Sequence, residues 1–214
     1  MRLEEYEHII WDWNGTLFDD VDLCVNIING VLKRRGLPQL TVEKYKSIFT
    51  IPVENYYIAA GFDFSVEPFE KVGKEWMDEY EERKLESGLS KGAMEMLNYL
   101  KGKGIKQSIL SAYKQDTLNA VVDHFGIREY FEFIIGLNHI YATSKIDLGR
   151  ELIKKIGASP EKTLLIGDTV HDFEVANEIG ARCVLLAGGH QSREKLSRCG
   201  VPVFNSLTDL MNNR

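Results

Sequence analysis

Residues 8–19 have the sequence HIIWDWNGTLFD, and this stretch decides how the rest of the chain is interpreted. Its apolar run, residues 8–11, ends abruptly at Asp12, and the pair Asn14-Gly15 follows closely. A short apolar run bounded by a turn signal is typical of a buried strand that ends in a tight turn. Asp12 is therefore predicted to lie at the carboxyl end of a strand.

Four further apolar runs resemble the first one, and helical patterns alternate with them. The runs occupy residues 105–111, 133–136, 163–167 and 182–187, and the helical patterns occupy residues 90–103, 115–125, 147–156 and 172–179. Strands that alternate with helices through short, glycine-containing connections are typical of a parallel sheet covered by helices. The sequence thus predicts an α/β fold with a doubly wound, mainly parallel sheet and a Rossmann-like core.

The stretch between residues 19 and 88 breaks this alternation, because it contains no convincing strand. Gly36 is placed as a helix stop, and Thr41 could cap a short helix. Apolar residues recur at helical spacing, namely Val21, Cys24, Val25, Ile28, Val31 and Leu32, and later Phe69, Val72, Trp76 and Tyr80. We therefore expect residues 19–88 to form a small all-helical cap inserted after the first strand, and residues 1–18 and 89–214 to form the catalytic core.

The composition restricts the class of partner. The 214 residues include 26 basic and 32 acidic side chains, for a formal net charge of -6. A protein that binds duplex nucleic acid needs a basic surface, and no cluster of Lys and Arg with interleaved aromatic residues occurs. Nucleic acid is thus not expected as a partner, whereas a small phosphorylated metabolite is compatible with the sequence.

The apolar runs and the cysteines bear on location. No apolar run approaches the length of a membrane span, and the first residues, MRLEEYEH, lack a signal-peptide pattern. Cys24, Cys183 and Cys199 are far apart and have no CxxC spacing, so neither a disulfide framework nor a zinc site is indicated. The expectation is a cytoplasmic protein with three reduced thiols and no membrane partner. The sequence predicts no particular oligomeric state.

Polar residues follow several of the predicted strands. Asp12 follows the first, Ser111 ends the segment SILS, and Asp168 and Asp172 lie in LLIGDTVHD; Lys145 opens a predicted helix in TSKID. In open α/β sheets ligands bind outside the carboxyl ends of the strands, near the point where the winding reverses. These five side chains are therefore expected to face one crevice.

Each of these residues, taken singly, also has an ordinary structural explanation. Asp12 could simply belong to a turn, Ser111 could be a hydroxyl at a strand end, and Lys145 could be a surface lysine. Asp168 could be the N-cap of a helix and Asp172 a carboxylate in its first turn. Taken together, these structural explanations are less convincing, because five side chains with unrelated structural roles would have to meet in one crevice by coincidence.

Phosphoryl transfer requires the chemical groups that this set provides. Three carboxylates at close quarters repel one another unless a hard cation neutralises them, and oxygen ligands suit Mg²⁺. A carboxylate can attack phosphorus and form an aspartyl-phosphate, which divides one difficult displacement into two steps. A lysine offsets the charge of the transferring group, and a hydroxyl and loop amides hold its oxygens.

The same residues carry a resemblance to a known family. DWNGTLFD, residues 12–19, resembles the D-x-D-G-T-[LV]-x-D signature of the haloacid dehalogenase-like superfamily. Ser111, Lys145 and GDTVHD (residues 167–172) resemble its second, third and fourth motifs, in order and at plausible separations. The helical insertion and the segment HFGIREYFEFIIG, residues 124–136, are similar to the phosphoglycolate phosphatase-like subgroup. The resemblance covers nearly the whole chain, and its first and fourth motifs are the specific ones.

The resemblance implies a role for each site residue. Asp12 would be the nucleophile and a Mg²⁺ ligand, and Asp168 would bind the metal directly. Asp172 would support the water shell of the metal or Lys145, which would orient Asp12 and the phosphate. Candidate phosphate-binding residues are Trp13, Gly15, Thr16, Ser111, Ala112 and Lys145. Trp13 could instead pack under the cap, and Thr16 and Asp19 could stabilise the turn and the entry to the cap.

The chain departs from the family pattern at one catalytic position. The second aspartate of the first motif, which is the general acid and base of the family, is Asn14 here. The family uses the main-chain carbonyl at this position as a Mg²⁺ ligand, so metal binding is expected to survive. An amide cannot donate and recover a proton near neutral pH, and a positioned acid is worth about 10²–10⁴-fold. Asn14 therefore indicates an adaptation to activated phosphates, another proton donor, or weak or lost activity.

The leading hypothesis is a Mg²⁺-dependent phosphatase that acts on a small phosphorylated metabolite. A dehalogenase would tolerate Asn14 but would not use the metal that GDTVHD implies, and a phosphonate-cleaving enzyme would need a Schiff-base lysine such as Lys44 or Lys46. A protein that keeps the fold and binds metal or ligand without catalysis is the alternative from another class. Among the histidines, His171 is expected to be exposed in the first turn of its helix.

Overall fold

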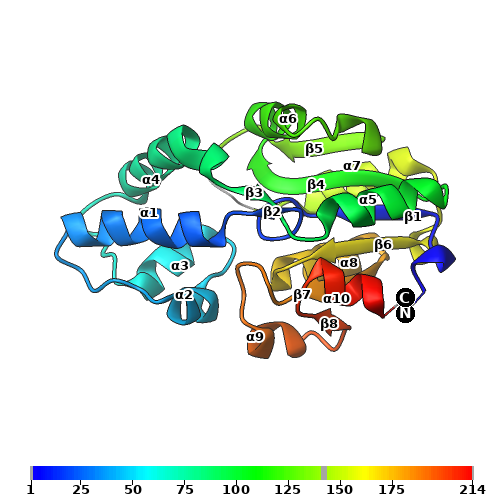
Figure 1. The fold of residues 1–214 in the computed structure, drawn as a ribbon. Coiled ribbons are helices and arrows are strands. Elements are labelled where there is room, and N and C mark those ends of the chain that lie inside the picture. Colours follow the sequence, from blue (N-terminus) through cyan, green and yellow to red (C-terminus); the bar gives the residue numbers. More distant parts are fainter. Residues whose placement is uncertain (1, 141–143, 214) are drawn as a thin grey trace.

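The structure is a computed structural model that describes residues 2–140 and 144–213. Its centre is a six-stranded sheet with the order β5-β4-β1-β6-β7-β8 (Figure 1). Every pair of neighbouring strands is parallel. The strands are β1 (His8–Trp11), β4 (Lys106–Lys114), β5 (Phe133–Leu137), β6 (Thr163–Gly167), β7 (Arg182–Leu186) and β8 (Val203–Phe204). The predicted doubly wound parallel sheet is confirmed.

Helices cover both faces of this sheet. Alternate residues of β1 point to opposite faces, so Ile9 belongs to one hydrophobic cluster and Ile10 to the other. The helices of the core are α5 (Ala93–Gly102), α6 (Gln115–His124), α7 (Ile146–Ile156), α8 (Val170–Ile179), α9 (Arg193–Ser197) and α10 (Leu207–Asn212). Apolar residues of α5, α6 and α10 pack in the cluster of Ile9, and those of α7, α8 and α9 pack in the cluster of Ile10. Short 3-10 helices occupy Leu3–Glu5, Lys84–Glu86, Arg128–Tyr130 and Pro160–Lys162.

Four helices form a separate lobe beside the carboxyl ends of the strands (Figure 1). They are α1 (Val21–Arg34), α2 (Val42–Ile48), α3 (Val53–Ala60) and α4 (Phe69–Arg83). Gly36 adopts a positive φ of 67° just after α1, and the hydroxyl of Thr41 accepts a hydrogen bond from the Lys44 amide at the start of α2, at 3.1 Å. Both features are as the sequence predicts, whereas α3 is not apparent from the apolar spacing.

The prediction that residues 19–88 contain no strand is wrong at the two ends of this segment. The strand β2 (Phe18–Asp19) pairs antiparallel with β3 (Gly88–Leu89). A ladder of two residues is too short to produce an alternating pattern, and its partners are far apart in the sequence. The pairing brings the two connections between lobe and core side by side.

The topology places β1 at the point where the winding reverses. The chain runs from β1 to β4 and β5 on one side, and then to β6, β7 and β8 on the other. Asp12 therefore emerges between β4 and β6, where side chains from three neighbouring strand ends converge. Across residues 2–140 and 144–213, no helix is long and apolar enough to cross a membrane.

Candidate active site

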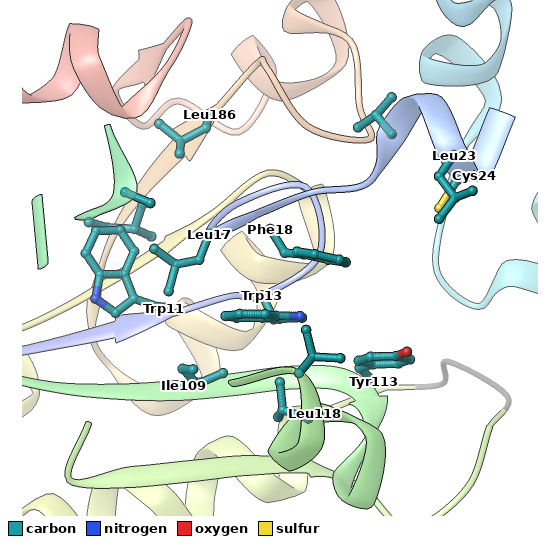
Figure 2. Close-up of a cluster of buried hydrophobic side chains, with 14 of the residues drawn as sticks. Trp11, Trp13, Leu17, Phe18, Leu23, Cys24, Ile109, Tyr113, Leu118 and Leu186 are labelled. Carbon is teal, nitrogen blue, oxygen red and sulfur yellow. The ribbon is translucent and has the colours of Figure 1, made fainter. Parts of the chain in front are cut away.

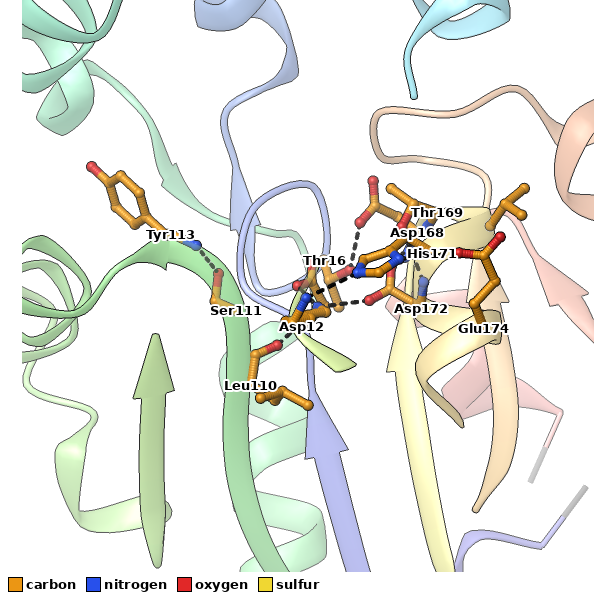
Figure 3. Close-up of polar contacts among 12 residues, drawn as sticks. Asp12, Thr16, Leu110, Ser111, Tyr113, Asp168, Thr169, His171, Asp172 and Glu174 are labelled. Carbon is orange, nitrogen blue, oxygen red and sulfur yellow. Dashed lines mark hydrogen bonds and ion pairs between the residues drawn. The ribbon is translucent and has the colours of Figure 1, made fainter. Parts of the chain in front are cut away.

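Lys145 contacts Asp12 at the place where the side chains of Asp12, Asp168 and Asp172 converge, and Figure 3 shows these three carboxylates. Lys145 is the N-cap residue of α7, and its side chain is only 2% exposed. Its ammonium group contacts Asp12 Oδ1, lies 2.7 Å from Asp172 Oδ1, and donates a hydrogen bond to the Leu110 carbonyl at 2.9 Å. This lysine is therefore held by two carboxylates and one main-chain carbonyl of the core.

The charges of this group depend on one another. Burial alone would lower the pKa of Lys145, but the Asp12 and Asp172 carboxylates raise it above its ordinary value, so the lysine stays charged. Burial opposes ionisation of Asp172, yet Lys145 and hydrogen bonds from Thr169 hold the pKa of that carboxyl low. Burial raises the pKa of Asp12 well above its ordinary value, despite Lys145. A further cation nearby would favour the ionised form of Asp12.

Asp168 is held by the loops on either side of it. The Thr16 hydroxyl donates to its Oδ1 at 3.1 Å, and the His190 amide donates to its Oδ2 at 2.5 Å. A Cβ atom would lie 2.4 Å from Asp168 Oδ2 at Gly15 and 2.2 Å from it at Gly189, so both positions require glycine. Gly15 thus allows a close approach to Asp168, in addition to the tight turn that the sequence predicts.

Asp172 belongs to a capping box at the start of α8. Its Oδ2 accepts hydrogen bonds from the Thr169 amide at 2.9 Å, the Thr169 hydroxyl at 2.6 Å and the Asp168 amide at 3.2 Å. The alternative that Asp168 caps this helix is wrong, because Thr169 is the N-cap residue. Since Asp172 Oδ1 faces Lys145, the geometry favours a role in holding that lysine.

The carboxylates suit a hard cation. Asp12, Asp168 and Asp172 are all buried, and one oxygen of each lies within 4.8 Å of an oxygen of the other two. Burial also raises the pKa of Asp168, to about 6. One lysine cannot neutralise three buried carboxylates, and an all-oxygen donor set matches the preference of Mg²⁺. These residues therefore fit the metal that the sequence predicts.

The Asn14 side chain does not stand alone in the turn. Its Nδ2 donates to Asp20 Oδ2 at 2.7 Å and to the Tyr80 hydroxyl at 2.8 Å. The Tyr80 hydroxyl donates in turn to Asp20 Oδ2 at 2.6 Å, and the Gly15 amide donates to Asp20 Oδ1 at 3.0 Å. The sequence assigns the stabilising role to Asp19, but Asp19 is exposed and Asp20 performs it. Nothing in the pair of adjacent aspartates indicates which one points inward.

His190 is a second residue that sequence reasoning missed. It is 5% exposed and lies between the Tyr45 hydroxyl, 2.8 Å from Nδ1, and Asp20 Oδ1, 3.2 Å from Nε2. Burial alone would lower the pKa of His190, but the Asp20 carboxylate raises it to about 9. A positively charged His190 therefore connects α2 of the cap lobe to the core. Its only sequence signal is the pair of glycines that precedes it.

The expectation that His171 is exposed is wrong. Its side chain is 5% exposed, and its Nε2 accepts a hydrogen bond from the Lys145 amide at 3.1 Å. Its Nδ1 lies 3.1 Å from Glu174 Oε2 (Figure 3). The fourth motif, residues 167–172, lies against the start of α7, and this contact buries the first turn of α8 next to Lys145.

The remaining candidates divide between the cavity and the core. Ser111 and Ala112 line the cavity above Asp12, and Ser111 Oγ accepts a hydrogen bond from the Tyr113 amide at 3.1 Å. Trp13 is fully buried and stacks on Phe18, with 5.4 Å between ring centroids (Figure 2). The ring of Trp13 is therefore packed in the core, and the role of Trp13 in binding phosphate stays a prediction.

Comparison with known proteins identifies relatives of this arrangement. A family model described as haloacid dehalogenase-like hydrolase matches residues 9–186. The chain is 26% identical over 198 residues to the 5'-nucleotidase of Pseudomonas aeruginosa, covering 89% of this chain and 87% of that protein. It is also 26% identical over 211 residues to the phosphoglycolate phosphatase of Caulobacter vibrioides, covering 94% of this chain and 88% of that protein. A solved haloacid dehalogenase-like protein from Streptococcus pneumoniae has a TM-score of 0.82 at 18% identity, with 98% of each chain covered.

These findings agree with the site that the residues build. The family model spans the first strand, the cap lobe and the strand that follows the fourth motif, so it includes Asp12, Lys145 and Asp168. The relatives are named as enzymes that cleave phosphate esters, and the prediction of an enzyme of the hydrolase class is confirmed. The chain belongs to the haloacid dehalogenase-like hydrolase family.

Proposed function

We propose that the protein is a Mg²⁺-dependent phosphatase that hydrolyses a small phosphorylated metabolite through an aspartyl-phosphate on Asp12. The contact of Lys145 with both Asp12 and Asp172, next to the buried Asp168, carries this proposal. The net charge of -6 supports a small-molecule substrate rather than nucleic acid. Cys24, Cys183 and Cys199 are all free thiols, which supports a reducing compartment such as the cytoplasm.

Each residue then has a task in the reaction. Asp12 attacks phosphorus while Lys145 orients its carboxylate and offsets the charge of the phosphoryl group. Ser111 and the neighbouring loop amides hold phosphoryl oxygens, and water then hydrolyses the aspartyl-phosphate. Asp12, Asp168 and the main-chain carbonyl of Asn14 would hold Mg²⁺, which supplies positive charge where the transferring group gathers negative charge.

The helical lobe, residues 19–88, acts as a cap in this proposal. The cavity above Asp12 is lined by residues of both the core and the lobe. A cap that covers the site excludes water and provides contacts to the leaving group. The metal-binding donor set argues against a dehalogenase, and neither Lys44 nor Lys46 lines the described cavity, as a phosphonate-cleaving mechanism would need.

Removing the metal tests this proposal directly. We expect the purified protein to release phosphate from members of a phosphate-ester panel with Mg²⁺, and to lose that activity when a chelator removes the metal. Phosphate release is the readout, and added Mg²⁺ should restore it. The engaged side chain of Asn14 favours a second candidate, a protein that binds ligands without catalysis. Failure to hydrolyse any ester with Mg²⁺ present would decide for that candidate.

The two aspartates of the fourth motif should differ in their effect on the metal. We expect Asp168→Ala to weaken Mg²⁺ binding more than Asp172→Ala does, because Asp172 is occupied by Lys145 and by the capping box. Calorimetric titration of Mg²⁺ into both variants measures the difference. The opposite order would show that the two roles are exchanged. Circular dichroism of Asp172→Ala controls for the lost helix cap.

A further inference from the structure

The cavity above Asp12 has two chemically different walls. The core side supplies Asp12, Ser111 and Lys145, which surround the phosphoryl group in the proposed mechanism. The cap side supplies almost entirely aromatic and aliphatic side chains, among them Tyr45, Phe49, Tyr56, Phe69, Trp76 and Tyr80. The leaving group of a substrate would therefore meet an apolar wall.

The aromatic side chains on the cap side of the cavity, which we call the aromatic wall, are held in place by contacts between their own rings. Tyr45, Phe49 and Tyr56 lie with their ring centroids 5.3–5.4 Å apart. Trp76 stacks on Tyr80 at 4.9 Å, and Tyr80 meets Tyr113 edge-on at 5.7 Å. Rings at these distances favour stacked and edge-on arrangements with a further ring. A ring on the substrate would thus enter a preorganised aromatic site.

The wall offers little to a second negative charge on the substrate. Among the described residues that line the cavity there is no arginine, Lys145 is engaged by Asp12 and Asp172, and His190 is paired with Asp20. The remaining cation is Lys114, whose side chain is 40% exposed and whose Nζ lies 3.9 Å from Asp116. An exposed lysine beside a carboxylate attracts an anion weakly. A leaving group with a carboxylate or a second phosphate is therefore disfavoured.

The tyrosine hydroxyl groups of the aromatic wall differ in their hydrogen-bond partners. The Tyr56 hydroxyl is buried and has no hydrogen-bond partner among the described residues, whereas those of Tyr45 and Tyr80 are engaged by His190 and Asp20. Burial raises the pKa of Tyr56, so this hydroxyl stays neutral. A buried donor without a partner costs free energy. The Tyr56 hydroxyl therefore adds no positive charge that would attract a second anionic group of a substrate.

We propose that the substrate is an aryl phosphate, whose leaving group is a phenol that carries no second acidic group. The proposal rests on the phosphatase function. Asp12 Oδ forms the bond to phosphorus as the bond from phosphorus to the phenol oxygen breaks, and the electron pair leaves on a phenolate that takes its proton from solvent. A phenolate departs without an acid, which agrees with Asn14 in the first motif.

Matched substrates separate ring binding from leaving-group chemistry. Benzyl and propyl phosphate both lose an alkoxide of high pKa, so their difference reports mainly the ring. We expect kcat/KM with Mg²⁺ to be about tenfold or more higher for benzyl than for propyl phosphate, from the apolar area that the ring buries. Phenyl phosphate should exceed both, and phosphoglycolate should fall below benzyl phosphate. Phosphoglycolate or a nucleoside monophosphate turned over as efficiently as phenyl phosphate would overturn the proposal.

Variants of the aromatic wall provide a second test of the aryl phosphate proposal. Trp76→Leu should lower kcat/KM for benzyl and phenyl phosphate about tenfold and leave propyl phosphate within about twofold. Ile58→Ala is the matched control, since Ile58 is an apolar cap residue that is 54% exposed. A uniform loss on every substrate would overturn the assignment of Trp76.

The proposal and the phosphatase function fail in different ways. No turnover of any ester refutes the function itself. Turnover without a preference of benzyl over propyl phosphate refutes only the aryl proposal. Calorimetric binding of phenyl phosphate to the Asp12→Asn variant gives a readout without catalysis, and we expect it to be weakened by adding Trp76→Leu.

Discussion

Asp12→Asn should reduce Mg²⁺-dependent turnover to background on every phosphate ester. The substitution removes the attacking carboxylate and one oxygen ligand of the metal at the same time. It also removes one of the two carboxylates that hold Lys145, although Asp172 remains 2.7 Å from the ammonium group. Phosphate release under single-turnover conditions, with excess enzyme, is the most sensitive measurement because it detects even one slow cycle.

The control for this variant is an exposed aspartate. Asp147→Asn removes a carboxylate in the first turn of α7 that is 88% exposed, close in sequence to Lys145. It should leave turnover unchanged. Both variants should give native circular dichroism, since neither substitution alters the size of a core side chain. Substantial metal-dependent activity in Asp12→Asn would mean that another group attacks phosphorus, and the mechanism would have to be abandoned.

The fold was predictable because its signals are local. Apolar runs such as residues 163–167 are buried on both faces, and each is followed by a turn residue and a helical pattern, so a parallel sheet follows from the chain alone. The short ladder of Phe18 with Leu89 carries no such signal. Its existence depends on where the cap lobe begins and ends, which is a property of the tertiary structure.

The site residues also differ in whether a local sequence signal reveals them. Asp12 and Asp168 are found from sequence because each terminates a strand at the reversal of winding. His190 and Asp20 are not found from sequence, because their importance comes from burial beside Tyr45 and Tyr80 of the cap lobe. Spacing along the chain does not reveal a pair of charges that is created by the packing of two lobes. The aromatic wall is likewise a product of helices that are distant in sequence.

Asn14→Asp should raise rates on alkyl phosphates by about 10²–10⁴-fold and change rates on activated esters little. The native protein should show a steep dependence of rate on the pKa of the leaving group, because Asn14 cannot donate a proton. The variant should flatten that dependence. A series of substituted phenyl phosphates together with propyl phosphate measures both slopes.

The surroundings of Asn14 make the introduced carboxyl a competent acid. Asn14 Nδ2 lies 2.7 Å from Asp20 Oδ2, and the near-isosteric aspartate would place a carboxyl oxygen beside that carboxylate. A like charge at this distance disfavours ionisation and raises the pKa of the new group, so that it retains its proton nearer to neutral pH. Asn177→Asp, at an exposed position of α8, is the control and should have no effect.

Two results would contradict this account of Asn14. If the native protein hydrolyses propyl phosphate efficiently and Asn14→Asp brings no gain, then another residue or a water molecule supplies the proton. If the native protein is inactive on every ester and the variant is active, the natural protein is a ligand-binding member of the family that a single substitution converts into an enzyme. A gain confined to alkyl phosphates, in contrast, would fit a phosphatase whose aromatic cavity and missing acid both select phenolic leaving groups.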